Sequence, residues 1–396
     1  MRRLLDGRSR LQFPPPMWKV KRELARIGHQ FDDFVLRVSG ISLTELYFRY
    51  VINPKVIQKT GTITVGKRAA IYLIFPSDGL LASHILALDY ITDCGYVPVV
   101  VSNLPLDAKA EHLILQKSAG LIIRPNFGYD FAAYRDGMKF LGTKLADLDY
   151  LAIFNDSTWF PAQPERNWLI EAEQTGYDYV GSVFHGGMNA DCKWDFRHDV
   201  WRIDTNLPRY HYGSYSLLIS GKVLRSAQFA QFWQDYRASN DKARTILGGE
   251  IGLTQMVVKA GFSHGATLDN SRLDSLLDEL PLDRLRDLAC NTMTPVCLSL
   301  RQLRLQLMVA APPDRVELRN FILKSVVKEG PAYALVDFDV RDRSGNFIKK
   351  SSVALDQTTG KQTLDLLRQL PSPQAAVFLE EATAVYRMKH GEKTPT

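Results

Sequence analysis

Between residues 69 and 157, apolar runs of strand length alternate with segments whose apolar residues recur at helical spacing. The runs are AAIYLIF (69–75), YVPVVVSN (96–103), LIIRPN (121–126) and DYLAIFNDS (149–157). Strands that alternate with helices in this way predict a doubly wound, mostly parallel sheet with helices on both faces, which is an α/β fold. Ligands bind such sheets beyond the carboxyl ends of the strands. The polar residues that end these runs are therefore the first candidates for a binding site.

The pattern loosens after residue 160. Residues 177–184 (YDYVGSVF) predict a further strand, and residues 212–236 predict a strand followed by an amphipathic helix. Residues 246–262 (ILGGEIGLTQMVVKAGF) predict a short loop that enters a helix. Residues 275–310 favour helices, whereas residues 333–355, which contain the turn RSGN, favour strands.

These patterns divide the chain into three predicted parts. Residues 1–67 form a basic amphipathic arm, which the linker-like residues 53–68 close. Residues 68–272 form the α/β domain, and residues 273–396 form a smaller α+β region to which the sequence assigns no role.

The composition is that of a folded globular protein, with 45% hydrophobic and 23% charged residues. The net charge is +6, and the whole positive surplus lies in the first 70 residues. Such an arm either lies on an anionic membrane surface or packs on the main body with its basic face in solvent. Nucleic acid is not an expected partner, because the main body has no basic stripe with interleaved aromatic residues.

Several classes of protein lack support in the sequence. No stretch approaches the length of a membrane span, and the N-terminus lacks the apolar core of a signal peptide, so we expect a cytoplasmic protein. The four cysteines form no CxxC pair and the histidines lack metal-ligand spacing, so neither a disulfide framework nor a zinc site is expected. Walker A, GxGxxG, GxSxG and HExxH motifs are absent.

The stretch RPNFGYDFAAYRDG (124–137) follows the third apolar run. Gly128 allows backbone N–H groups to approach a ligand, and a helix that begins near Tyr129 directs its positive end toward phosphate. Asp130 lies on one face of that helix, and Arg135 offers a guanidinium for a phosphate or carboxylate. The alternative is a capped helix start with an Asp–Arg pair on the surface.

The fourth run ends in FNDST, which places Asn155 and Asp156 directly after a buried strand. A carboxylate there holds a divalent cation that bridges two phosphates, or accepts hydrogen bonds from a ribose. The alternative is a turn in which Asn155 or Asp156 caps the next segment.

Further candidates lie downstream. Glu250 follows two glycines at the predicted start of an apolar helix, where it serves either as a capping residue or as a general base. Residues 185–198, with His185 and Asp195, are predicted to cover an acceptor pocket, and HYGSY, from His211 to Tyr215, is predicted to line it.

Five of these motifs, in this order, resemble the rhamnan synthesis protein F family of bacterial polysaccharide glycosyltransferases over roughly residues 68–270. The motifs are NFGYDFAAYRDG, YLAIFNDSTWFP, YDYVGSV, GSYSLLISGKVLRSAQFAQFW and GGEIGLTQMVVKAGF. The resemblance implies a GT-A-like fold and transfer of a sugar from a nucleoside diphosphate sugar. dTDP-rhamnose is the favoured donor, and the expected acceptor is a lipid-linked glycan of the O-antigen or capsule type.

The resemblance also implies roles for individual residues. Asn126, Gly128 and Asp130 correspond to positions at the nucleotide, Asp156 to the diphosphate or ribose, and Glu250 to the base that deprotonates the acceptor in an inverting reaction. The chain has Asn-Asp-Ser where GT-A enzymes usually have DxD. Either Asp156 binds Mg²⁺ or Mn²⁺ with waters, or basic residues such as Arg135 hold the phosphates without a metal. A non-catalytic glycan-binding or assembly subunit, and a transferase with another nucleotide donor, are the alternative functions.

Overall fold

The computed structural model describes residues 28, 34–35, 38, 42–309 and 314–391. The chain divides into two compact units, residues 1–54 and residues 55–396. The described part of the first unit forms α2 (Leu43–Tyr47), which continues into the π-helical turn η1 (Phe48–Ile52). Most of the predicted basic arm lies outside the described residues, so its amphipathic helix and its membrane surface stay predictions.

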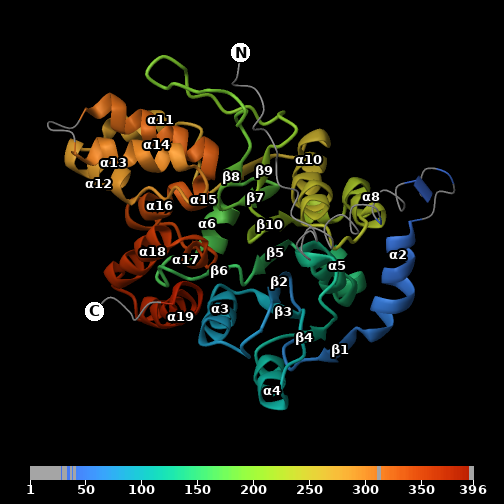
Figure 1. Cartoon of the computed structure of the whole chain (residues 1–396). Helices are drawn as coiled ribbons and strands as arrows, with labels where there is room; N and C mark the ends of the chain where they lie inside the picture. The colour runs from blue at the N-terminus through green and yellow to red at the C-terminus, as the bar shows by residue number, and fades with distance from the viewer. Residues whose placement is uncertain (1–27, 29–33, 36–37, 39–41, 310–313, 392–396) are drawn as a thin grey trace, which may run out of the picture. The chain divides into compact units, whose positions relative to one another are not determined.

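The second unit is built around an eight-stranded sheet (Figure 1), with the strand order β1-β4-β3-β2-β5-β10-β7-β11. Its strands are β1 (Ile57–Thr60), β2 (Arg68–Ile74), β3 (Val97–Ser102), β4 (Gly120–Ile123), β5 (Tyr150–Asn155), β7 (Tyr179–Gly181), β10 (Ser216–Ser220) and β11 (His264–Ala266). The four apolar runs form β2, β3, β4 and β5, which are parallel to one another. The predicted α/β fold with a mostly parallel central sheet is confirmed.

Two strands depart from the predicted pattern. The segment interpreted as a linker contains β1, which pairs antiparallel with β4 at the edge of the sheet. Most of its residues are exposed, so it carries no apolar run to reveal it. β10 lies antiparallel between β5 and β7. Its direction was not predictable, because a buried apolar run indicates a strand but not the direction in which the strand runs.

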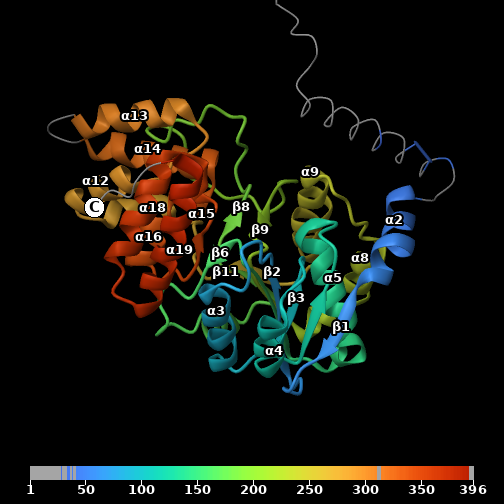
Figure 2. The same cartoon turned by 60° about the horizontal axis from the view of Figure 1, so that its bottom comes forward.

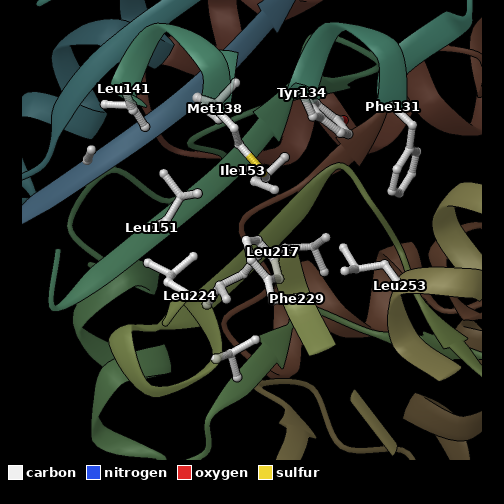
Figure 3. Packing of buried hydrophobic residues seen from close by; sticks show 14 of the residues in the cluster. Phe131, Tyr134, Met138, Leu141, Leu151, Ile153, Leu217, Leu224, Phe229 and Leu253 are labelled. Atoms are coloured by element: carbon white, nitrogen blue, oxygen red, sulfur yellow. The ribbon is translucent and has the colours of Figure 1, made fainter. Parts of the chain in front are cut away.

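Helices cover both faces of the sheet, as predicted. On β2, Ile71 and Leu73 face one apolar core, while Tyr72 and Ile74 face the other. Figure 3 shows the first core, where Met138 of the overlying helix lies beside the sheet residue Ile153. The helices on this side are α5 (Tyr129–Leu141), α7 (Gly221–Leu224), α8 (Ala227–Asp235) and α10 (Gly252–Lys259), and those on the other are α3 (Ala82–Asp93), α4 (Ala108–Gln116) and α6 (Trp168–Gln174).

Short elements connect this frame. They are the 3-10 helices η2 (Asn53–Lys55) and η3 (Gly142–Asp147), the hairpin strands β8 (Phe184–His185) and β9 (His211–Tyr212), the helix α9 (Lys242–Thr245) and the π-helix η4 (Ile246–Ile251). Among the described residues, no helix combines the length and the apolar character that a membrane crossing requires.

The C-terminal region is almost entirely helical, so the prediction of strands over 333–355 was wrong except at the short strand β12 (Ile348–Lys349). Its elements are α11 (Leu273–Glu279), α12 (Leu282–Asn291), α13 (Leu298–Val309), α14 (Arg315–Glu329), α15 (Pro331–Ala334), α16 (Val336–Asp342), β12 (Ile348–Lys349), α17 (Ser352–Leu355), α18 (Gln357–Gln369) and α19 (Pro373–His390). The apolar–acidic alternation in VDFDV resembles a strand, but Asp339 pairs with Arg343 one helical turn later, which favours the helix.

This region packs against the sheet domain within the second unit (Figure 2). β12 pairs antiparallel with β6 (Thr158–Trp159), the short strand that follows β5. Glu381 of α19 accepts hydrogen bonds from the backbone N–H of Ser83 (3.0 Å) and from the Trp159 indole (2.9 Å). Residues 348–350 are thereby held beside the turn that ends β5.

Candidate active site

The turn before α5 is held by a buried arginine. Arg124, at the end of β4, donates to Asp136 Oδ2 on α5 (2.8 Å), to Asn103 Oδ1 beyond β3 (2.7 Å) and to the carbonyl oxygen of Phe127 (2.7 Å). The side chains of Arg124 and Asp136 are almost fully buried. The Asp–Arg pair of this stretch is therefore an internal tie between two strand ends and a helix, and not a surface pair.

Gly128 caps α5 in a left-handed conformation, with φ of +78°. Its N–H donates to Asn240 Oδ1 (2.7 Å). This backbone donor, which the sequence analysis directed at a ligand, is therefore occupied within the protein. Tyr129, the first residue of α5, also has a positive φ of 49°, an unfavourable conformation for a residue with a side chain. Backbone strain thus accompanies the entry to α5.

Replacement of Gly128 by Ala is expected to lower the free energy of unfolding by about 2–4 kcal/mol. The new Cβ would lie 2.6 Å from Ala132 Cβ and would also strain the left-handed backbone. Gly95→Ala is the matched control, since Gly95 has a φ of +81° and open space around it. Urea unfolding of both variants measures the difference, and equal losses would show that the contact with Ala132 has no effect.

Asp130 and Asn155 meet across the carboxyl ends of the sheet. Asn155 Nδ2 donates to Tyr134 Oη (2.8 Å) and to Asp130 Oδ2 (3.3 Å). Burial, and the nearby carboxylate of Glu250, raise the pKa of Asp130 to about 6. The structure thus brings together the two segments that the sequence analysis singled out.

The same network continues to Glu250. The Tyr134 hydroxyl donates to the carbonyl oxygen of Ser214 (3.0 Å), and the N–H of Ser214 donates to Glu250 Oε1 (2.7 Å). Glu250 does not start a helix, so that prediction was wrong. It lies in η4, between α9 and α10, because the two glycines before it are accommodated inside a continuous helical segment. The carboxylate therefore caps no helix of its own.

His211 lies beside Glu250, and His185 packs against His211. The rings of His185 and His211 are stacked, with centroids 5.3 Å apart. His211 Nδ1 donates to the Arg209 carbonyl oxygen (2.7 Å), and its Nε2 lies 3.9 Å from Glu250 Oε2. Burial, then the charges of His211 and Lys349, hold the pKa of His185 well below its usual value. Both imidazoles line a cavity of about 300 Å³ beside the C-terminal residues 326–331.

Asp156 points away from this network, toward α3. Its Oδ2 accepts from the backbone N–H of Phe75 (2.6 Å) and from His84 Nε2 (3.2 Å). The Leu81 N–H donates to His84 Nδ1 (3.1 Å), which places the ring proton on Nε2. Burial acts to raise the pKa of Asp156, but the hydrogen bond from His84, the charge of Lys350 and the hydrogen bond from the Phe75 N–H together hold it below its usual value. This residue is an anion at neutral pH.

A dedicated metal site is not apparent in the described part of the chain, where no group of three or more His, Cys, Asp or Glu side chains is placed to hold an ion. Asp156 is the one predicted ligand. Among the described residues, the hydrogen bonds to its side chain all go to Oδ2, which leaves Oδ1 as a candidate cation ligand.

Three predicted site residues lie apart from the network. Arg135 is buried and donates to the carbonyl oxygen of Tyr236 (3.0 Å), on the side of α5 away from Asp130. Asn126 is exposed. Asp195 pairs with Arg197 in a loop whose Phe196 N–H is bound by Asn320 of α14, so it does not cover the cavity.

Tyr215 is buried at the centre of the site, and a lysine that sequence reasoning missed lies over it. Lys349 Nζ is 3.8 Å from the centre of the Tyr215 ring and 3.3 Å from Ser157 Oγ. Burial raises the pKa of the Tyr215 hydroxyl. No signal near the recognised motifs indicated Lys349, because it comes from the C-terminal region, 87 residues after the last motif ends at Phe262. His84 was missed because, in the sequence, it is one polar residue within a mostly apolar helical segment.

The charged side chains lie beyond the carboxyl ends of β2 and β5, where the strand order reverses. In α/β proteins this is the place where ligands bind, so the architecture is that of a ligand-binding protein. The model of the family described as rhamnan synthesis protein F (RgpF) matches residues 98–289. This match confirms the predicted resemblance over that part of the chain.

Individual proteins are more distantly similar. "Uncharacterized protein y4gN" of Sinorhizobium fredii (strain NBRC 101917 / NGR234) is 29% identical over 249 residues, which cover 62% of this chain and 59% of the relative. Two solved structures are also similar. The Saccharomyces cerevisiae mannosyltransferase Ktr4p is 12% identical, with 48% of this chain and 67% of that chain covered and a TM-score of 0.27. Staphylococcus aureus TarS 1-349 in complex with UDP-GlcNAc is 8% identical, with 82% of this chain and 89% of that chain covered and a TM-score of 0.30. TM-scores this low leave both likenesses without weight for the fold or the function.

Proposed function

We propose that the chain is a GT-A-like glycosyltransferase that moves a sugar from a nucleoside diphosphate sugar to a hydroxyl group of a growing cell-surface polysaccharide. The observation that carries the proposal is the network from Asp130 through Asn155 and Tyr134 to Glu250, which lies at the ligand-binding edge of the sheet. The match of residues 98–289 to a polysaccharide synthesis family supports the reaction class.

In this proposal, Glu250 is the general base. It takes the proton of the acceptor hydroxyl, whose oxygen forms a bond to the anomeric carbon as the bond to the diphosphate breaks and its electron pair leaves with the phosphate oxygen. Attack from the face opposite the leaving group inverts the anomeric configuration. His211, beside Glu250, lines the cavity into which the acceptor fits.

The donor side of the proposal involves the other carboxylates. Asp156, ionised and half-buried, is suited to a ribose, or it would hold one Mg²⁺ or Mn²⁺ ion. When bound, such an ion would neutralise the diphosphate. The half-buried Asp130 is suited to the nucleotide. The favoured donor is dTDP-rhamnose, and the favoured acceptor is a lipid-linked glycan at an anionic membrane surface.

The proposal is tested by calorimetry of the full-length protein with dTDP, UDP and GDP, each with and without Mn²⁺. We expect one diphosphate to bind with a micromolar dissociation constant, and a panel of nucleotide sugars with the matching nucleotide to include one donor whose nucleotide is released in the presence of an acceptor glycan. Binding of none of the three would refute the proposal and favour a non-catalytic assembly subunit.

A further inference from the structure

The charge of Lys349 is unexplained by the contacts within the protein. β12 and β6 place Lys349 opposite Thr158, beside the turn that ends β5. The ammonium group donates to Ser157 Oγ (3.3 Å) and lies over the Tyr215 ring. A lysine ammonium has three donors, and the described residues provide only this one hydrogen-bond acceptor.

The neighbouring Lys350 has a different environment. Its Nζ donates to Ser83 Oγ (3.1 Å) and lies 3.9 Å from Glu381 Oε2, so its charge is matched by a carboxylate. Lys349 has no carboxylate within ion-pair distance among the described residues, although both lysines are half-buried. Lys349 ends β12 and Lys350 begins the turn that follows, yet among the described residues only Lys350 has a counter-ion.

Burial lowers the pKa of Lys349 to about 8, while the negative charges of Glu250 and Asp130 act to raise it. The carboxylates are thus near enough to influence the ammonium, but they do not pair with it. A half-buried cation without a carboxylate partner is unfavourable for folding, because one hydrogen bond and one ring contact replace only part of the hydration that it loses. An anion from outside the protein would satisfy it.

We propose that Lys349 binds the diphosphate of the nucleoside diphosphate ligand, so that the C-terminal region completes the donor site. This inference rests on the proposed function. A lysine binds phosphate as a compact point charge, and among the described residues two of its three donors have no acceptor. When the sugar leaves, the electron pair of the broken bond stays on the diphosphate, and Lys349 faces the added charge.

The test compares Lys349→Met with Lys349→Arg in the full-length protein. Met keeps most of the volume and removes the charge, whereas Arg keeps the charge. Lys144→Met is the matched control, because Lys144 is an exposed lysine on η3, before β5 and away from the carboxyl ends of the strands. Calorimetry measures the dissociation constants of dTDP, UDP and GDP and of the corresponding nucleosides, which lack the phosphates.

We expect Lys349→Met to weaken binding of the preferred diphosphate by about 10- to 100-fold and to leave nucleoside binding unchanged. Lys349→Arg should retain most of the affinity, and Lys144→Met should retain all of it. Thermal unfolding of Lys349→Met should occur at the wild-type temperature or higher, because the variant no longer buries a charge.

Each other outcome is decisive. Equal loss of nucleoside and diphosphate binding, together with a lower unfolding temperature, would assign Lys349 a structural role and overturn the inference. Unchanged diphosphate binding with a raised KM for the acceptor would place Lys349 at an acidic acceptor sugar and also overturn it. If the wild-type protein itself binds no diphosphate, the proposed function fails together with the inference.

Discussion

Glu250→Gln is expected to slow sugar transfer by about 10²- to 10⁴-fold and to leave the affinity for the nucleoside diphosphate unchanged. Gln has nearly the same shape, and its Oε1 still accepts the N–H of Ser214, so the network around it should persist. Gln cannot take the proton of the acceptor hydroxyl. The rate constant kcat, from the release of nucleotide, and calorimetry with the diphosphate together measure the two effects.

Glu173→Gln is the control for this variant. The side chain of Glu173 is 14% exposed against 20% for Glu250, and it too accepts hydrogen bonds, from Arg68 and Tyr96. It lies at the amino end of β2, so kcat should stay within a factor of two of wild type. Turnover of Glu250→Gln at a near-normal rate would remove Glu250 from the role of base. A joint loss of binding and turnover would indicate damage to the site rather than to the proton transfer.

Arg124→Met is expected to lower the free energy of unfolding by about 3–5 kcal/mol, the largest effect on stability that we predict. The variant leaves the Asp136 carboxylate buried without its guanidinium, and it also leaves Asn103 Oδ1 and the Phe127 carbonyl without their donors. Lys139 Nζ lies 3.8 Å from Asp136 Oδ1, but it is half exposed and compensates only in part. Urea denaturation at pH 7 measures the loss.

A double variant separates the buried charge from the lost packing. Arg124→Met with Asp136→Leu removes both charges, so it should be more stable than Arg124→Met alone. A loss below about 1 kcal/mol in the single variant, or an additive loss in the double variant, would contradict the interpretation that a desolvated ion pair holds the start of α5 in place.

The parts of the fold that were predictable are those that local sequence determines. A continuous apolar run must be buried on both faces, so the four runs specified four strands, and the segments between them specified helices on both sides. The proximity of Asp130 and Asn155 followed from the same reasoning, because parallel strands bring their carboxyl ends to one edge. The order of strands and helices along the chain was sufficient to predict both the four strands and the proximity of Asp130 and Asn155.

Other features depend on contacts that sequence order does not reveal. Glycines 248 and 249 suggested a helix start at Glu250, whereas the chain continues through them as a π-helix, because Phe131 packs against Gly249 and fills the space that a side chain would need. Asp195 looked like a pocket residue because acidic and aromatic residues surround it, but its partner, Arg197, lies two residues away. Lys349 could be found only from the pairing of β12 with β6.

The two adjacent lysines, Lys349 and Lys350, direct their charges to different sides. Lys349 ends β12 and Lys350 begins the turn after it, and one ammonium group reaches Tyr215 while the next reaches Glu381. A slip of β12 by one residue against β6 would put Ile348 or Lys350 in the place of Lys349 and would leave one of the two sides without its ammonium group. The register of this short pairing therefore decides which charge faces the site.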